Sequence, residues 1–299
     1  MASPELHALV TKLRATGLSS PDQTVDEIRA AWERFASVFP AAADISFEPQ
    51  DAGGVPCEWV TAPDVDAGRV VLYCHGGGYN IGTLTSYRNF TGHLARGTRA
   101  RVLAVGYRLA PEHPFPAALD DVVAAYRWLL GQGIAADRIL VMGDSAGGGL
   151  ALASTIALRN AGDPLPAGVV AIGPLTDLAK ESPSIRERAH LDPIVTYDSS
   201  MAHAMRYVGG DAAKLKDPLA SPLYSDLHGL PPLLIMVGTH ESLFDDSSRF
   251  AAKAEAAGVD VEFDVWEEMI HVWPIFADIL PEGREAIAKI GSFVDARLA

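Results

Sequence analysis

The chain has 299 residues, of which 48% are hydrophobic and 21% are charged, and its formal net charge is −14. The hydrophobic content is too high for a disordered chain, and Gly and Pro are not in excess. The acidic balance argues against nucleic-acid binding, which requires a basic surface. A chain of this length can bury most of its unfolded surface, in two domains or in one α/β domain.

The start of the chain and its cysteines bear on location. Met1–Val10 contains an acid, a proline and a histidine rather than the basic and then apolar segments of a signal peptide. No uninterrupted apolar stretch reaches the ~18–20 residues of a membrane span. We therefore expect a cytoplasmic protein without membrane attachment. Cys57 and Cys74 each lie in an apolar run, so we expect two buried reduced thiols rather than a disulfide.

The first forty residues predict two helices, because their apolar side chains recur at helical spacing. These positions are Leu6, Leu9, Val10 and Leu13, followed by Val25, Ile28, Trp32, Phe35 and Phe39. Thr24 and Glu27 have the spacing of a capping box at the start of the second helix.

From residue 45 onward, strand-like and helical segments alternate. The predicted strands are Ile45–Pro49, Val55–Val60, Val70–Cys74, Arg101–Tyr107, Arg138–Met142, Val169–Ile172, Leu233–Val237 and Val261–Trp266. The predicted helices are Leu119–Leu130, Ala146–Asn160, Phe250–Ala257 and Gly283–Leu298. This alternation predicts a mostly parallel sheet with helices on both faces. The polar, proline-interrupted segment Asp177–Leu223 breaks the alternation and is predicted to be an insertion.

Gly143–Gly147 reads GDSAG and fits the pattern G-x-S-x-G. A predicted strand precedes it and a predicted helix follows, as in a nucleophile elbow. In such a turn the glycines leave room for a strained backbone. The turn would aim the Ser145 hydroxyl above the sheet and the Ala146 N–H at a reacting carbonyl. The alternative is a glycine-rich turn with an idle serine.

A second glycine motif, His75-Gly76-Gly77-Gly78, directly follows the predicted strand Val70–Cys74. Successive glycines let backbone N–H groups approach a ligand, as an oxyanion hole requires. The alternative is a flexible loop without a function. His75 is expected to hold this loop by hydrogen bonding, because the catalytic base follows the serine in this type of fold.

With these motifs in this order, the chain resembles the hormone-sensitive-lipase family of bacterial esterases, in its GDSAG subgroup. The resemblance is carried by His75–Tyr79, Tyr107–Pro116, Gly143–Gly148, Leu230–Gly238 and His271–Trp273. It covers essentially the whole chain and implies an α/β-hydrolase fold, with a mostly parallel central sheet flanked by helices. It further implies a helical cap formed by residues 1–43 and 177–223, over a catalytic core of residues 44–176 and 224–299.

The expected chain order of the catalytic residues is serine, acid, histidine. His271 is the expected base, because it follows the predicted strand Val261–Trp266 and precedes the last helix. Glu241 is the expected acid, at a position where the resembling family usually has Asp. Asp245 is the rival acid.

The sequence thus predicts a Ser145–His271–Glu241 triad that hydrolyses carboxylic esters through an acyl-enzyme. The N–H groups of Gly77, Gly78 and Ala146 are the expected oxyanion donors, with Gly76 and His75 supporting the loop. No cofactor and no metal site are expected, since no metal-binding motif is present.

The substrate is less defined by the sequence. Phe35, Phe39, Met201 and Met205 either line the pocket or attach the cap to the core. We expect small-molecule esters with short acyl chains; lactones, carbamates or acetylated natural products are the alternative. A binding protein without catalysis, as in the gibberellin receptors that lack the catalytic histidine, is disfavoured because all three triad residues are present. The resemblance also suggests a homodimer, since many of the resembling esterases pair through edge strands and helices near the C-terminus.

Tyr107 and Arg108 are expected to be structural. For Arg108 we expect a buried carboxylate partner near the elbow, with Asp144 as a candidate. We assign Asp144 no chemical step.

Overall fold

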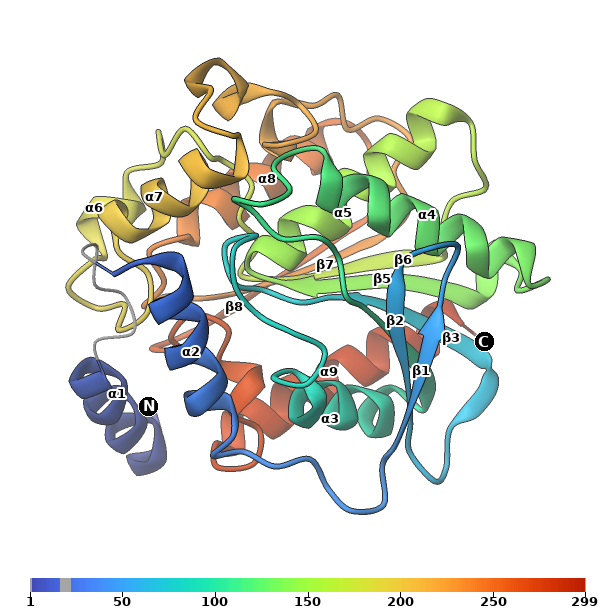
Figure 1. Ribbon diagram of the computed structural model, residues 1–299, viewed down its shortest axis with the longest axis horizontal. Helices are drawn as coiled ribbons and strands as arrows, with labels where there is room; N and C mark the ends of the chain where they lie inside the picture. Colours follow the sequence, from blue (N-terminus) through green and yellow to red (C-terminus); the bar gives the residue numbers. More distant parts are fainter. Residues whose placement is uncertain (1, 17–22, 299) are drawn as a thin grey trace.

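The structure is a computed structural model that describes residues 2–16 and 23–298. Its centre is an eight-stranded sheet with the order β1-β2-β4-β3-β5-β6-β7-β8 (Figure 1). The strands are β1 Ser46–Asp51, β2 Pro56–Thr61, β3 Asp66–Cys74, β4 Ala100–Val105, β5 Ile139–Asp144, β6 Gly168–Ile172, β7 Leu233–Gly238 and β8 Val261–Trp266. β2 pairs antiparallel with both β1 and β4, whereas all other neighbours pair in parallel. The predicted mostly parallel sheet is thereby confirmed.

Helices cover both faces of the sheet. They are α1 Pro4–Thr16, α2 Val25–Ala36, α3 Arg88–Thr98, α4 Ala117–Gly131, α5 Ala146–Ala161, α6 Ser184–Glu187, α7 Tyr197–Tyr207, α8 Phe244–Ala256 and α9 Pro281–Arg297. Short 3₁₀ turns span Ala136–Arg138, Ala212–Lys216, Pro222–Tyr224 and Trp273–Phe276. Figure 1 shows α4, α5 and α8 on one face of the sheet, and α3 and α9 on the other.

The two faces correspond to two buried apolar clusters, because alternate strand residues point to opposite sides of a sheet. Leu72 of β3 packs in the cluster that includes Leu150 of α5. Its neighbour Tyr73 packs in the cluster that includes Leu94 of α3 and Ile290 of α9. The central strands are therefore buried on both faces, which explains their continuous apolar sequences.

Most predicted elements are present, with small differences at their ends. The capping box of α2 is confirmed, since Thr24 and Glu27 exchange both bonds. Cys57 and Cys74 are free and buried, as expected. α8 begins at Phe244 rather than at Phe250, and β4 ends at Val105 rather than at Tyr107.

Helix α3 was not predicted from the sequence. It has no side-chain cap at its start, and it contains Gly92 and Gly97, which are poor helix formers. The structure gives a reason for Gly97: a Cβ there would lie 2.2 Å from Cγ2 of Ile287 in α9. Close packing of α3 against α9 therefore requires glycine where helix propensity disfavours it.

The insertion 177–223 contains α6, α7 and two 3₁₀ turns, and the structure describes no strand between β6 and β7. Arg14 of α1 donates to the carbonyl of His190 at 2.8 Å, which links the N-terminal helices to the insertion. Residues 1, 17–22 and 299 of the predicted cap and core lie outside the described residues. Within the described ranges, no helix is long and apolar enough to cross a membrane.

Candidate active site

The candidate site lies where several parallel strands end. Ser145 follows β5, His75 follows β3, and Gly173 follows β6 directly; Glu241 and His271 come shortly after β7 and β8. The carboxyl ends of parallel strands meet at one edge of a sheet, which is where open α/β sheets bind their ligands.

Ser145 occupies a sharp turn between β5 and α5, with φ 52° and ψ −121°. Left-handed φ values are unfavourable for a non-glycine residue, so the surroundings must hold this conformation in place. A Cβ at Gly143 would lie 2.2 Å from the carbonyl oxygen of Gly147, and one at Gly147 would lie 2.1 Å from that of Cys74. Both glycines of the GDSAG motif are therefore required by the tight turn.

His271 connects the serine to a carboxylate. Its Nε2 lies 2.9 Å from Oγ of Ser145, and its Nδ1 lies 2.7 Å from Oε2 of Glu241. Glu241 and His271 are 0% and 2% exposed. The second carboxylate oxygen of Glu241 accepts the backbone N–H of Gly238 at 2.7 Å, which fixes the orientation of the carboxylate.

Burial and pairing act in opposite directions on these two groups. Burial raises the pKa of Glu241, and its bonds to His271 and Gly238 oppose that rise. Burial lowers the pKa of His271, but the hydrogen bond and the charge of Glu241 outweigh it, so the net pKa is raised.

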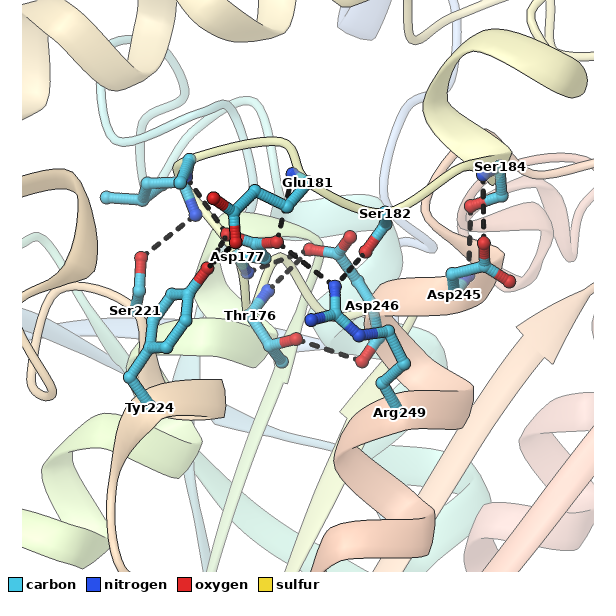
Figure 2. Close-up of polar contacts among 12 residues, drawn as sticks. Thr176, Asp177, Glu181, Ser182, Ser184, Ser221, Tyr224, Asp245, Asp246 and Arg249 are labelled. Atoms are coloured by element: carbon cyan, nitrogen blue, oxygen red, sulfur yellow. Dashed lines mark hydrogen bonds and ion pairs between the residues drawn. The ribbon is translucent and has the colours of Figure 1, made fainter.

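Asp245, the rival acid, lies elsewhere. Its carboxylate accepts the backbone N–H of Ser184 at 2.9 Å, and its own N–H donates to the Ser184 hydroxyl at 3.0 Å (Figure 2). Asp245 therefore connects α8 to α6, and Glu241 is the carboxylate that the structure brings to His271.

Gly173 belongs to the site but was not found from the sequence. It has φ 51°, and a Cβ at this position would lie 2.5 Å from Oε2 of Glu241 and 3.0 Å from Nδ1 of His271. Only glycine leaves room for the pair. The sequence did contain one indication of this role: Gly173 directly follows the buried strand β6, at the carboxyl edge of the sheet.

The loop after β3 presents two glycines beside Ser145. Gly77 and Gly78 have φ values of 111° and 61° and line the same cavity as the serine. Within the described residues, their N–H groups make no internal hydrogen bond. Ala146 is the first residue of α5, so its N–H has no partner in the helix. Among the described residues, none of the three N–H groups predicted as oxyanion donors therefore has a hydrogen-bond acceptor within the protein.

His75 is buried behind this loop. Its Nδ1 donates to the carbonyl of Gly76 at 2.7 Å, and its ring stacks on Tyr107 with centroids 4.3 Å apart. The Tyr107 hydroxyl donates to the His75 carbonyl at 2.7 Å. Burial lowers the pKa of His75 to about 4, so the ring is neutral at physiological pH. His75 thus contacts the loop through hydrogen bonds and ring stacking, and its supporting role in catalysis stays a prediction.

Asp144 lies against the same loop, and its carboxylate accepts several hydrogen bonds. It accepts hydrogen bonds from the N–H of Gly76 at 2.9 Å, from the hydroxyl of Tyr87 at 3.3 Å and from the hydroxyl of Tyr73. Burial raises its pKa to about 6, although the hydroxyl and amide donors oppose the shift.

The suggested Arg108–Asp144 pair is wrong. Arg108 pairs instead with Asp121 of α4, with Nη2 and Oδ1 2.7 Å apart. The Arg108 side chain is 48% exposed, whereas Asp144 is buried and already satisfied by three donors. Arg108 lies on the loop after β4 and is held by Asp121, whereas the Asp144 carboxylate is occupied by Tyr73, Gly76 and Tyr87.

A cavity of about 130 Å³ opens onto Ser145, His271, Gly77 and Gly78. Its other lining residues are Leu13, Gln23, Ile28, Trp32, Phe35, Ile81, Tyr87, Asp144, Leu175, Ile194, Val195, Ser199, Ser200, Ala202, His203, Arg206, Leu243, Val272, Ile275 and Phe276. Of the four cap residues suggested as lining, Phe35 alone is in this set.

The other three suggested residues do not line the described cavity. Phe39 lies beyond the end of α2 and packs edge-on against Phe276, with centroids 6.0 Å apart. Met205 packs against the core, and Met201 is one helical turn from it. The helix α7 directs Ser199, His203 and Arg206 toward the cavity instead, because these positions share a different face.

Polar contacts attach the start of the insertion to the helix that follows Glu241 (Figure 2). The carboxylate of Asp246 in α8 accepts the N–H groups of Thr176 and Asp177, each at 2.9 Å. Arg249, one turn further, lies 3.2 Å from Asp177 and donates to Ser182 at 2.7 Å. The insertion and the segment carrying Glu241 are therefore bound together.

Comparisons with known proteins agree with this architecture. A family model described as alpha/beta hydrolase fold matches residues 71–275. An acetyl-hydrolase of Streptomyces hygroscopicus is 43% identical over 297 residues, which cover 98% of this chain and 97% of that protein. A crystal structure of an esterase from the bacterial hormone-sensitive lipase family is 45% identical, with a TM-score of 0.96 and 100% of each chain covered. The crystal structure of another esterase, soaked by p-nitrophenyl butyrate, is 43% identical, with a TM-score of 0.95 and 99% of each chain covered.

The chain belongs to the α/β-hydrolase fold family and resembles the bacterial hormone-sensitive-lipase esterases within it. It is a serine carboxylester hydrolase that acts on small-molecule esters.

Proposed function

We propose that the enzyme hydrolyses short-chain acyl esters with a triad of Ser145, His271 and Glu241. The observation that carries this proposal is the continuous hydrogen-bonded line from Glu241 through His271 to Ser145, with contacts of 2.7 Å and 2.9 Å. A serine is a weak nucleophile until an adjacent base accepts its proton, and the base must be held in the correct tautomer.

In the proposed mechanism, Nε2 of His271 takes the Ser145 proton while Oγ attacks the ester carbonyl. Glu241 keeps the other proton on Nδ1 and stabilises the imidazolium that forms. The N–H groups of Gly77, Gly78 and Ala146 stabilise the oxyanion. His271 then protonates the leaving alcohol, and water, activated by the same histidine, releases the acid from the acyl-enzyme.

A preference for short acyl chains is supported by the size and lining of the cavity. The cavity has a volume of about 130 Å³, and most of its lining side chains are apolar. The names of two relatives point the same way, since one is an acetyl-hydrolase and the other was soaked with a butyrate ester. Lactones, carbamates or acetylated natural products would use the same three residues.

Hydrolysis of p-nitrophenyl esters from acetate to palmitate tests this proposal. We expect activity to peak at short chains, and Ser145→Ala to lower kcat by roughly 10³–10⁶-fold. A Ser145→Ala protein with wild-type activity would refute the nucleophile. A maximum at palmitate would refute the chain-length preference. Three other features stay predictions: a homodimer, a cytoplasmic location and the division into cap and core. Light scattering of the purified protein tests for the homodimer.

A further inference from the structure

One wall of the cavity differs in chemistry from the rest. Most other lining residues from α1, α2 and the core are apolar, whereas four of the five lining residues from α7 are polar: Ser199, Ser200, His203 and Arg206, beside Ala202. Ser199, His203 and Arg206 follow helical spacing, so one face of α7 is directed at the cavity. We call Ser199, His203 and Arg206 the α7 wall.

Arg206 has no partner among the residues that the structure describes. Within residues 2–16 and 23–298, its guanidinium makes no ion pair, no hydrogen bond and no ring contact, although the side chain is partly buried. Other arginines of this acidic chain are paired: Arg29 with Glu112, and Arg88 with Glu58, at 2.7 Å and 2.6 Å. The net charge of −14 means that acidic side chains outnumber basic ones. Nevertheless, none of the acids in the described part of the chain forms an ion pair with Arg206.

His203 lies between Arg206 and the oxyanion loop. A Cβ at Gly78 would lie 2.8 Å from Cγ of His203, so the ring packs directly on that loop. The Nδ1 of His203 is buried and has no hydrogen-bond partner. Burial and the nearby Arg206 charge lower the pKa of His203 to about 4, so the ring is neutral and carries one N–H donor.

Other buried polar atoms in the cavity lining also lack partners. They are the indole Nε1 of Trp32, which can only donate, and Oε1 of Gln23. The acid in the lining, Asp144, is already engaged by Gly76, Tyr73 and Tyr87. Oε1 of Gln23 is an acceptor and needs a donor instead. A buried polar group without a partner is costly, so the Arg206 cation and the N–H groups of His203 and Trp32 are the donors in the described lining that an external acceptor would satisfy.

We propose that the α7 wall binds a carboxylate carried by the substrate, so that the preferred esters bear an anionic group besides the scissile ester. This inference rests on hydrolysis at Ser145, the function proposed above, and narrows its substrate class. Arg206 would pair with the carboxylate through charge-assisted hydrogen bonds, with His203 able to donate one more. A purely alkyl ester leaves these donors unsatisfied, which lowers its transition-state binding relative to the anionic ester.

Two matched substrate pairs test the proposal. The first pair, 4-acetoxybenzoate and its methyl ester, differs by a carboxylate on the leaving group. The second, the mono-4-nitrophenyl ester of fumaric acid and 4-nitrophenyl (E)-pent-2-enoate, differs by a carboxylate on the acyl group, and its trans double bond prevents that carboxylate from attacking its own ester. We expect Arg206→Met to lower the anionic-to-neutral ratio of kcat/KM by about 10-fold to 100-fold in one of the pairs. Arg206→Lys should retain part of that ratio, because it keeps the charge but loses the planar donor pair.

Arg186→Met is the matched control. Arg186 belongs to the same insertion, stacks on Tyr197 with its guanidinium carbon 3.6 Å from the ring centroid, and does not line the described cavity. The Arg186→Met substitution removes the same charge as Arg206→Met, but at a position outside the described cavity. It should therefore leave the anionic-to-neutral ratio of kcat/KM at the wild-type value. Equal losses in the Arg206 and Arg186 variants would show a general charge effect and overturn the proposal.

Binding to the Ser145→Ala protein separates this proposal from the esterase proposal. Calorimetry with both substrate pairs needs no turnover, so its outcome does not depend on which residues catalyse. We expect the anionic member of one pair to bind at least tenfold more tightly, and Arg206→Met in the same background to abolish the difference. Equal affinity within both pairs would overturn the anion site while leaving the esterase proposal untouched.

Discussion

The carboxylate of Asp144 accepts the backbone N–H of Gly76 at 2.9 Å, which joins the residue before Ser145 to the loop of predicted oxyanion donors. A Cβ at Gly76 would lie 2.3 Å from Oδ2 of Asp144, so the contact requires glycine. Ser145 and the loop of predicted oxyanion donors follow different strands, β5 and β3, and this bond sets their relative position.

Removal of the Asp144 carboxylate should therefore impair catalysis without touching the triad. We expect Asp144→Ala to lower kcat about 10²-fold, with a smaller change in KM, because Gly77 and Gly78 lose their support. Asp144→Asn should retain most activity, since its amide oxygen can still accept from Gly76. Steady-state kinetics on p-nitrophenyl acetate, with Tm as a folding check, measure both variants. Wild-type kcat in folded Asp144→Ala would exclude a positioning role.

The identity of the acid can be tested with two matched amides. Glu241→Gln should lower kcat by about 10³–10⁴-fold, because an amide cannot stabilise the imidazolium and favours the wrong tautomer. Asp245→Asn should leave kcat nearly unchanged, because Asp245 contacts Ser184 rather than His271. The opposite ranking of these variants would assign the acid to Asp245.

The pH profile of kcat/KM should report the His271–Glu241 pair. His271 must be neutral to accept the serine proton, so activity falls as the pH drops through its pKa. Since Glu241 holds the pKa of His271 above the ordinary 6.5, the acid limb should lie above pH 6.5. In Glu241→Gln the largest raising contribution to the pKa of His271 is lost, and the smaller ones from Asp192 and Asp144 remain, while burial still lowers the pKa, so the limb should move to lower pH. An unshifted limb in that variant would assign the titration to another group.

Gly173→Ala should inactivate the enzyme through a single added methyl group. Its Cβ would lie 2.5 Å from Oε2 of Glu241, which forces the acid away from His271. We expect kcat to fall at least about 10²-fold. Gly162→Ala is the control, because Gly162 also has a positive φ, of 76°, but its Cβ would meet nothing within 4 Å. Both variants should lose about 1 kcal/mol of stability from backbone strain, whereas only Gly173→Ala should lose activity. Similar activities in the two folded variants would contradict this account.

The sequence was most informative where local pattern and chemistry agree. The buried strands β3, β5 and β6 are short apolar runs, and Ser145 lies in a five-residue motif, so both could be predicted locally. The order of serine, acid and histidine then selected His271. Helix α3 was missed because its glycines serve tertiary packing, Gly97 against Ile287 of α9 and Gly92 against Ile45, and the sequence of the helix does not encode these contacts.

Relationships across the chain could not be predicted in the same way. Gly173 lies far from Glu241 and His271 in sequence, and its constraint exists only once three strands lie side by side. The partner of Arg108 was misassigned because the sequence shows many acids but not which of them is already satisfied. The orientation of α7 was also missed: hydrophobicity pointed to Met201 and Met205, whereas the cavity receives His203 and Arg206.

The attachment of the insertion to α8 through Asp246 and Arg249 has an evolutionary consequence. The bonds from Asp246 reach backbone N–H groups of Thr176 and Asp177, and so do not depend on the side chains farther along the insertion. Residues of α7 can therefore be substituted while the start of the insertion stays attached to α8. Substitutions in this one helix can therefore change the wall of the cavity without moving Ser145, His271 or Glu241.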